Sequence, residues 1–142
     1  MLIRLTPEQV EEGWDTFAPV LETALPSYMA ATRTAMTNIL RSILVEESDI
    51  WIYKKDGETK AVVMTSFYQD HVVNSLDLII YALVVLDDSV SDEDWLEGID
   101  TLRGYADKHE CGNVLAFVEN PIFKRKLERL GAEKVSLIMK LM

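Results

Sequence analysis

The stretch that decides the fold is Leu78-Ile79-Ile80-Tyr81-Ala82-Leu83-Val84-Val85-Leu86, followed at once by Asp87-Asp88-Ser89-Val90-Ser91-Asp92-Glu93-Asp94-Trp95. The first part is apolar on both faces, which predicts a central strand of a sheet. The second part begins a helix. In many α/β proteins such a junction binds phosphate, because the helix dipole and free N–H groups favour an anion. This turn instead carries five carboxylates, with no glycine and no basic residue.

The residues before this strand predict two helices and three strands. Thr6 as N-cap, Pro7 at the first helical position and Gln9 in a capping box predict a helix that ends near Leu25. An apolar stripe predicts a second helix, from about Ala30 to Glu46. Alternating apolar residues predict strands at residues 2–5, 50–53 and 61–68, the last two joined by a hairpin turn at residues 55–58.

The residues after the strand continue this alternation. A helix is expected from Ser91 to about Cys111, with Gly112 as its C-cap, and a second from Pro121 to Gly131. Strands are expected at residues 114–118 and 135–141. The order β-α-α-β-β-β-α-β-α-β predicts an α/β (α+β) fold with a mixed sheet and helices on both faces. No repeat or linker divides the chain, so we expect a single domain over residues 1–142.

Composition and charge narrow the class of protein. The net charge is −10, and residues 54–110 alone carry five Lys and Arg against thirteen Asp and Glu. This excess of negative charge argues against binding nucleic acid or an anionic membrane. The longest apolar run is nine residues, too short to span a bilayer. Cys111 is the only cysteine, which favours a reducing, cytoplasmic location. His71 and His109 lack neighbouring ligands, so no metal site is expected.

Two motifs near the C-terminus resemble a known family. They are Val114-Leu115-Ala116-Phe117-Val118-Glu119-Asn120 and Leu127-Glu128-Arg129-Leu130-Gly131-Ala132. With the order of elements, they resemble the GCN5-related N-acetyltransferase (GNAT) fold, in which a strand ends in Asn and the next helix ends at a Leu-Gly turn. The resemblance implies this fold for most of the chain.

The resemblance also implies where a cofactor would bind. The family holds the acetyl-CoA pyrophosphate in an Arg/Gln-x-x-Gly-x-Gly/Ala loop, which falls here on residues 90–95. Asp92, Glu93 and Asp94 stand in that loop and every glycine is missing. Two like charges about 5 Å apart near a surface repel by roughly 3 kcal/mol. Many members use a Tyr as general acid where this chain has Leu127.

The expectation that follows is a degenerate member of this fold, a non-catalytic binding or structural protein that acts through a protein interface. It needs no cofactor, and its partner is another protein or a second copy. The opening Thr6 to Gln9 with Trp14 is similar to some tailed-phage proteins, which implies a host-cytoplasm or virion location. The candidate interaction residues are the acids and bases of two surfaces: Asp92, Glu93, Asp94, Lys124, Arg125 and Arg129.

Other interpretations remain open. The main alternative is a divergent acyl-CoA-dependent N-acetyltransferase acting on a cationic amine. Acetyl-CoA would then lie between residues 83–86 and 114–118, bound by Val84, Val85, Leu86 and Asn120, with Asp87 or Asp88 as base. A further alternative is an acidic decoy of nucleic acid. The structural interpretation of the acidic turn is that Ser91 caps the helix and Asp94 closes a capping box. A Ca²⁺ site is less favoured, because the loop has no glycine.

Overall fold

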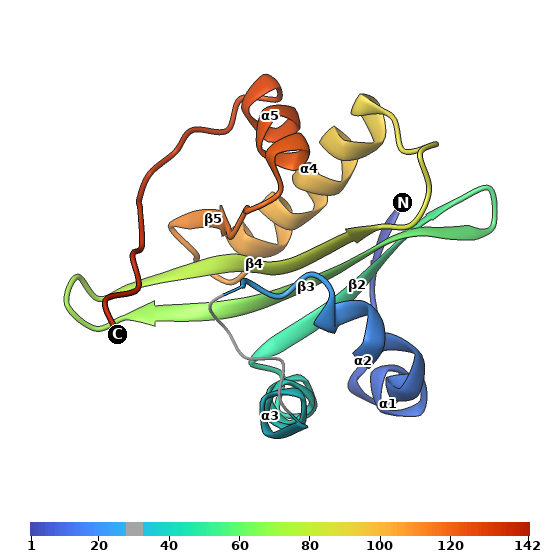
Figure 1. Cartoon of the computed structure of the whole chain (residues 1–142), viewed down its shortest axis with the longest axis horizontal. Coiled ribbons are helices and arrows are strands. Elements are labelled where there is room, and N and C mark those ends of the chain that lie inside the picture. Colours follow the sequence, from blue (N-terminus) through green and yellow to red (C-terminus); the bar gives the residue numbers. More distant parts are fainter. Residues whose placement is uncertain (28–32) are drawn as a thin grey trace.

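The computed structural model of the chain describes residues 1–27 and 33–142 (Figure 1). Its sheet has five strands in the order β1-β2-β3-β4-β5. The first four strands pair antiparallel, and β4 and β5 pair parallel through a helical crossover, as parallel neighbours require. This confirms the predicted mixed sheet. The strands are β1 (Leu2–Arg4), β2 (Ser48–Lys55), β3 (Glu58–Asp70), β4 (Ser75–Val85) and β5 (Asn113–Ala116).

Helices cover both faces of this sheet, as predicted (Figure 1). One face carries α1 (Pro7–Glu12), α2 (Trp14–Glu22) and α3 (Arg33–Leu44), and the other carries α4 (Asp92–Lys108) and α5 (Pro121–Arg129). The start of the predicted second helix, at Ala30, lies outside the described residues.

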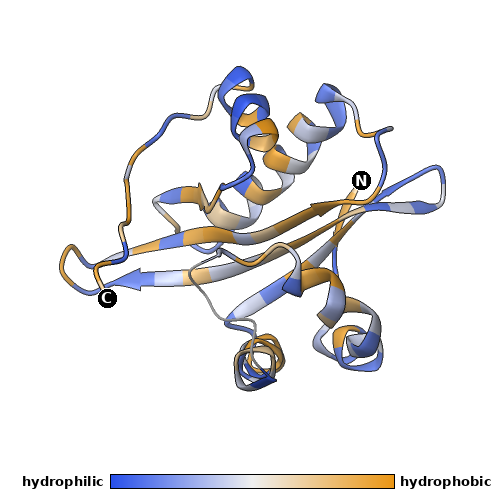
Figure 2. Cartoon of the chain, in the orientation of Figure 1, coloured by the Kyte–Doolittle hydropathy of each residue, from blue (hydrophilic) through white to orange (hydrophobic). Residues whose placement is uncertain are grey.

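The alternation of apolar residues in the strands divides the core into two layers (Figure 2). Ile50 packs with the helices α1–α3, whereas its neighbour Trp51 packs toward α4. The first layer comprises Val10, Leu21, Met36, Ile43, Ile50, Val62, Met64 and Ala82, and the second Leu2, Trp51, Tyr53, Ala61, Val63, Leu78, Leu102 and Ala106.

A β-bulge interrupts the pairing of β3 with β4. Met64 pairs with Ala82 and the next residue, Thr65, pairs with Ile80, so Tyr81 is the extra residue of β4. A bulge puts two successive side chains on one face and bends the strand. Tyr81 and Ala82 accordingly both pack on the α1–α3 side, whereas Ile80 packs on the other. The central strand therefore changes direction halfway along its length.

The predicted N-terminal helix is divided in two at Gly13. Its start is confirmed, because Gln9 N donates to Thr6 Oγ1 at 3.2 Å and Thr6 N donates to Gln9 Oε1 at 2.9 Å. At Gly13, a Cβ atom would lie 2.8 Å from the ring of Phe17. The position needs glycine because the aromatic ring covers it so closely.

Turn predictions were correct where the turn is a hairpin and wrong at one helix end. Asp56 and Gly57 take φ values of 54° and 77°, as a two-residue hairpin turn requires. The helix α4, however, has His109 as C-cap, and Glu110 takes the left-handed conformation at φ 59°. Gly112 was expected to be the cap, but its N–H donates to Leu76 O at 2.8 Å and joins the chain to β4.

The strand predicted at residues 135–141 was wrong. Residues 132–142 carry no helix or strand, and they extend away from α5 (Figure 1). Val135, Leu137 and Ile138 are between 67% and 69% exposed. Alternating apolar residues favour an extended conformation, but a strand also needs an edge to pair with. The nearest such element, β5, is only four residues long.

Candidate functional site

The parallel ladder between β4 and β5 is short. It runs from Asp77 opposite Asn113 to Ile80 opposite Ala116, and one more backbone bond joins Phe117 N to Ile80 O at 3.1 Å. The strand β5 ends there, whereas β4 continues to Val85. Residues 81–85 therefore extend past the last rung shared with β5. The bulge at Tyr81 coincides with this point, where β4 continues without β5 and which we call the opening.

Side chains from three segments border this opening. The rings of Tyr81 and Phe117 lie 5.1 Å apart, between centroids. Ser27 N, after α2, donates to Glu119 Oε1 at 2.7 Å, in the loop between β5 and α5. Asn120 Oδ1 accepts from Ile122 N at 2.8 Å and caps α5. The structure thus gives Asn120, an expected cofactor ligand, a local capping role.

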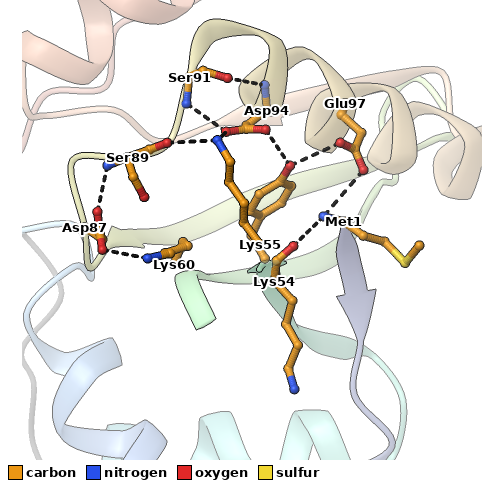
Figure 3. Close-up of polar contacts among 10 residues, drawn as sticks. Met1, Lys54, Lys55, Lys60, Asp87, Ser89, Ser91, Asp94 and Glu97 are labelled. Atoms are coloured by element: carbon orange, nitrogen blue, oxygen red, sulfur yellow. Dashed lines mark hydrogen bonds and ion pairs between the residues drawn. The ribbon is translucent and has the colours of Figure 1, made fainter. Parts of the chain in front are cut away.

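The acidic turn after β4 begins with a carboxylate fixed by a lysine (Figure 3). Asp87 Oδ2 accepts from Lys60 Nζ at 2.8 Å, and Asp87 Oδ1 accepts from Ser89 N at 2.7 Å. Lys60 also contacts Glu58 at 2.8 Å, and its side chain is 11% exposed. The bond from Lys60, aided by Ser89, lowers the pKa of Asp87 to about 2. Asp87 therefore stays ionised and takes up protons poorly.

A second carboxylate closes the start of α4. Asp94 accepts from Ser91 N at 2.9 Å while Asp94 N donates to Ser91 Oγ at 3.2 Å, which confirms the capping box. Lys55 Nζ donates to Asp94 Oδ2 at 2.7 Å and Tyr53 Oη donates to Asp94 Oδ1 at 3.0 Å (Figure 3). The bond from Lys55 holds the pKa of Asp94 well below its ordinary value. Burial raises the pKa of Tyr53, which also donates to Glu97 at 3.1 Å.

A third carboxylate joins the acidic turn to the basic helix α5. Lys126 Nζ and Arg129 Nη2 each donate to Asp92 Oδ1 at 2.8 Å. Lys126 Nζ also lies 5.8 Å from the ring centroid of Trp95. Two of the expected interaction residues, Asp92 and Arg129, are thus paired with each other within the chain. Glu93, Lys124, Arg125 and Asp88 are exposed.

Two hollows of the described surface lie away from this turn. One, of about 450 Å³, lies between β2 and the first two helices and is lined by Leu5, Gln9, Glu12, Gly13, Thr16, Phe17 and Ile52. The other, of about 270 Å³, lies beside Cys111 at the opposite end of α4. Burial raises the pKa of the Cys111 thiol and makes it a poor nucleophile. Over residues 1–27 and 33–142, no group of His, Cys, Asp and Glu is arranged to hold a metal. In the same residues no helix is both long and apolar enough to cross a membrane.

Solved structures match this chain over its whole length. AAC(6')-Iy, an aminoglycoside N-acetyltransferase, in complex with the bisubstrate analogue CoA-S-monomethyl-acetylneamine, is 14% identical with a TM-score of 0.73; the match covers 100% of this chain and 96% of that one. The ribosomal-protein-alanine N-acetyltransferase from Brucella melitensis biovar Abortus 2308 is also 14% identical, with a TM-score of 0.68 and the same coverage. A predicted acetyltransferase with acetyl-CoA, from Clostridium acetobutylicum, is 9% identical with a TM-score of 0.70, covering 100% and 95%. No protein-family model and no curated protein matches the sequence.

At these identities the likeness shows the fold, and the chain has the GNAT fold that its C-terminal motifs resemble. The comparisons also correct the functional expectation. The non-catalytic role was wrong as the leading interpretation, because proteins that share the entire architecture are acetyltransferases, some of them with CoA or acetyl-CoA. The expectation of no cofactor loses its support for the same reason. The alternative, an acyl-CoA-dependent acetyltransferase, fits better.

Coenzyme A fits one part of the site and not the other. Past the last rung with β5, the edge of β4 can pair with an extended chain that carries amides, such as the pantetheine arm. At the turn, the N–H groups of Ser89, Ser91 and Asp94 already donate to Asp87, Asp94 and Ser91, respectively. Carboxylates thus occupy donors that a pyrophosphate would need. The residues of the turn do not fit a pyrophosphate.

Sequence reasoning missed the two lysines and the tyrosine that hold this turn. Lys55, Lys60 and Tyr53 come from β2 and β3, at least 27 residues before their carboxylate partners. One signal was present. In the sequence, Lys60 directly precedes the apolar run of β3, and a lysine buried there needs a carboxylate partner. In the structure Lys60, taken as a whole residue, is 8% exposed.

Proposed function

We propose that the chain is an acyl-CoA-dependent N-acetyltransferase acting on a cationic amine. The observation that carries the proposal is the end of the β4–β5 ladder at Ile80 and Ala116, with β4 continuing past it. This opening occurs in a fold shared over the full chain with acetyltransferases. The ammonium form of the acceptor first releases one proton to solvent. The neutral amine then forms an N–C bond with the acyl carbon of the donor thioester, the C–S bond breaks, and the second proton that the nitrogen loses passes to the thiol.

The residues proposed to hold the donor are Val84, Val85 and Leu86. Their backbone groups lie on the part of β4 past the last rung with β5 and act by strand pairing, independent of side-chain identity. Leu86 N already donates to Lys60 O at 2.8 Å, so it faces β3. Val84, two residues before Leu86 and paired with Val62, faces β3 as well, so Val85 is the better candidate of the three.

The acids at the end of β4 are proposed to attract the acceptor. Asp87 is a weak base because its pKa is about 2, so an electrostatic role replaces the expected role as base. Asp88 is exposed beside it, and residues 54–110 carry a net charge of −8, from five bases and thirteen acids. Such a field concentrates cationic amines near the opening.

The test is a thiol-release assay with acetyl-CoA across diamines, polyamines, aminoglycosides and peptide N-termini. We expect turnover with at least one dicationic amine. Asp88→Asn is expected to lower kcat/KM for that amine about 2- to 10-fold, as the loss of one surface charge implies, and to change it less for a monoamine. Asp107→Asn, at the far end of α4, is the matched control. Absence of turnover with every amine, together with absence of CoA binding in calorimetry, contradicts the proposal.

A further inference from the structure

We infer that the acyl donor is recognised through its pantetheine arm alone, and that the nucleotide end of coenzyme A contributes nothing to binding. This inference rests on the proposed function. It follows from how the chain uses the two places that a CoA molecule would contact, the edge of β4 and the turn before α4.

The first step is that three N–H donors of the turn, those of Ser89, Ser91 and Asp94, are occupied by the chain itself. Ser89 N donates to Asp87 at 2.7 Å and Ser91 N donates to Asp94 at 2.9 Å. Asp94 N donates to Ser91 Oγ at 3.2 Å. An incoming phosphate would have to displace carboxylates that are themselves held by lysines, and it would lie beside them. Side chains of the turn therefore occupy these three N–H donors (Figure 3).

The second step is that the cations around the turn are already engaged. Lys55 pairs with Asp94 at 2.7 Å, and Lys60 pairs with Asp87 and Glu58, both at 2.8 Å. On the side of the turn that faces α5, Asp92 pairs with Lys126 and Arg129, both at 2.8 Å. Each of these four cations has a carboxylate partner within the chain, so none is free to offset the charge of a pyrophosphate.

The third step is that the arm and the nucleotide are chemically separable. A pantetheine thioester carries the acyl group whether it belongs to coenzyme A or to the phosphopantetheine of a carrier protein. In either case the amine nitrogen takes the acyl carbon, the C–S bond breaks, and the thiol leaves with the proton that the amine loses. The shared chemistry is the pantetheine thioester, and the experiment must distinguish its sources.

The experiment compares three donors with one amine: acetyl-CoA, S-acetylpantetheine and an acetylated carrier protein. We expect kcat/KM for S-acetylpantetheine to lie within about 3-fold of that for acetyl-CoA. In calorimetry, CoA and pantetheine should bind with equal affinity, and adenosine 3′,5′-bisphosphate should not bind. A carrier-protein value 10-fold or more above both small donors identifies the protein-bound source. A preference of more than 3-fold for acetyl-CoA over S-acetylpantetheine overturns the inference while leaving the proposed function intact.

A pair of variants tests the turn directly. Asp87→Asn and Asp94→Asn each remove one carboxylate and release one lysine, so CoA affinity should rise about 3- to 10-fold while pantetheine affinity stays unchanged. Asp107→Asn should change neither. If CoA affinity falls in both variants, the turn contributes to CoA binding and the inference is wrong. Binding of none of the donors, with no turnover, instead removes the proposed function on which the inference rests.

Discussion

The hydroxyl of Tyr105 joins two elements at the edge of the sheet. It donates to Asp49 Oδ2 at 2.7 Å and accepts from Arg4 Nη1 at 3.1 Å. Its ring contacts Trp51 edge-on, with 4.9 Å between centroids. Burial, followed by the bond to Asp49, raises the pKa of Tyr105 to about 12. One side chain of α4 thus satisfies a buried carboxylate of β2.

Removal of this hydroxyl should weaken the fold. Tyr105→Phe leaves Asp49, whose side chain is 8% exposed, with an ion pair to Arg4 at 3.6 Å but without the hydroxyl that donates to it. We expect the free energy of unfolding to fall by about 1–3 kcal/mol, the cost of an unsatisfied buried acceptor. Urea unfolding measures this value. Tyr68→Phe is the control, since Tyr68 is 49% exposed, and a loss no larger than in that variant contradicts the prediction.

At the residue scale, contacts between near neighbours could be predicted and contacts between distant residues could not. Both capping boxes, Thr6 with Gln9 and Ser91 with Asp94, are three residues apart and were identified from spacing. The bond from Lys60 to Asp87 spans 27 residues and depends on the pairing of β3 with β4. Nothing in a local pattern sets that distance. The side chains that pair with the carboxylates of the acidic turn can therefore be identified only from the fold.

At the scale of the element, the start of α4 depends on the ionised state of Asp94. The bond from Lys55 depresses the pKa of this carboxyl, whereas in the unfolded chain it is near 3.9. The stabilising contribution is therefore fully present above about pH 4 and is lost as the pH falls through the depressed folded value.

Asp94→Asn tests this dependence. We expect the variant to be less stable than the wild type at pH 7, and the difference to shrink as the pH is lowered from 4 toward 2. The reason is that only the wild type loses the contribution of this carboxylate in that range. Chemical unfolding at several pH values gives both curves. Asp100→Asn is the control, because Asp100 is 70% exposed on the same helix. A constant difference across the range contradicts the prediction.

Elements with a strong local signal were predicted well, and those that depend on a partner were not. The hairpin of β2 and β3 follows from the Asp56-Gly57 turn, and α5 follows from Pro121 and Gly131. The division at Gly13 was not predicted, and there the ring of Phe17 lies 2.8 Å from where a Cβ atom would be. The expected last strand lacks a partner edge, although its residues alternate as a strand does. Periodicity defines a conformation, and pairing depends on the rest of the sheet.

At the scale of the whole molecule, the arrangement of sheet and helices agrees with the predicted GNAT fold. The fold alone does not determine the function. The chain has the architecture of acetyltransferases, with one opening in its sheet where β5 leaves β4. Sequence reasoning predicted a cofactor site between residues 83–86 and 114–118, and this stays a prediction. It also gave too much weight to the acidic turn, and so favoured a non-catalytic role and kept acyl transfer as the alternative. The charge of Asp92, Glu93 and Asp94 argues against the binding of a pyrophosphate at this turn. It does not argue against acyl transfer itself.

The ion pairs of the turn also affect whether the proposed donor can acetylate the protein's own lysines. Thioesters acetylate lysines without any enzyme, but only the uncharged amine reacts. Asp87 and Glu58 raise the pKa of Lys60, and Asp94 raises that of Lys55, so both stay protonated beside the proposed donor. After incubation with acetyl-CoA at pH 8, we expect mass spectrometry to find acetyl groups on exposed residues such as Lys134 and Lys140 before Lys60.

Asp87→Asn should reduce this protection, because only Glu58 then pairs with Lys60, and raise the acetylated fraction of Lys60, with Asp107→Asn as control. Equal labelling of Lys60 and Lys140 in the wild type contradicts the prediction. The same carboxylates that fill the turn would then keep the catalyst from becoming its own substrate.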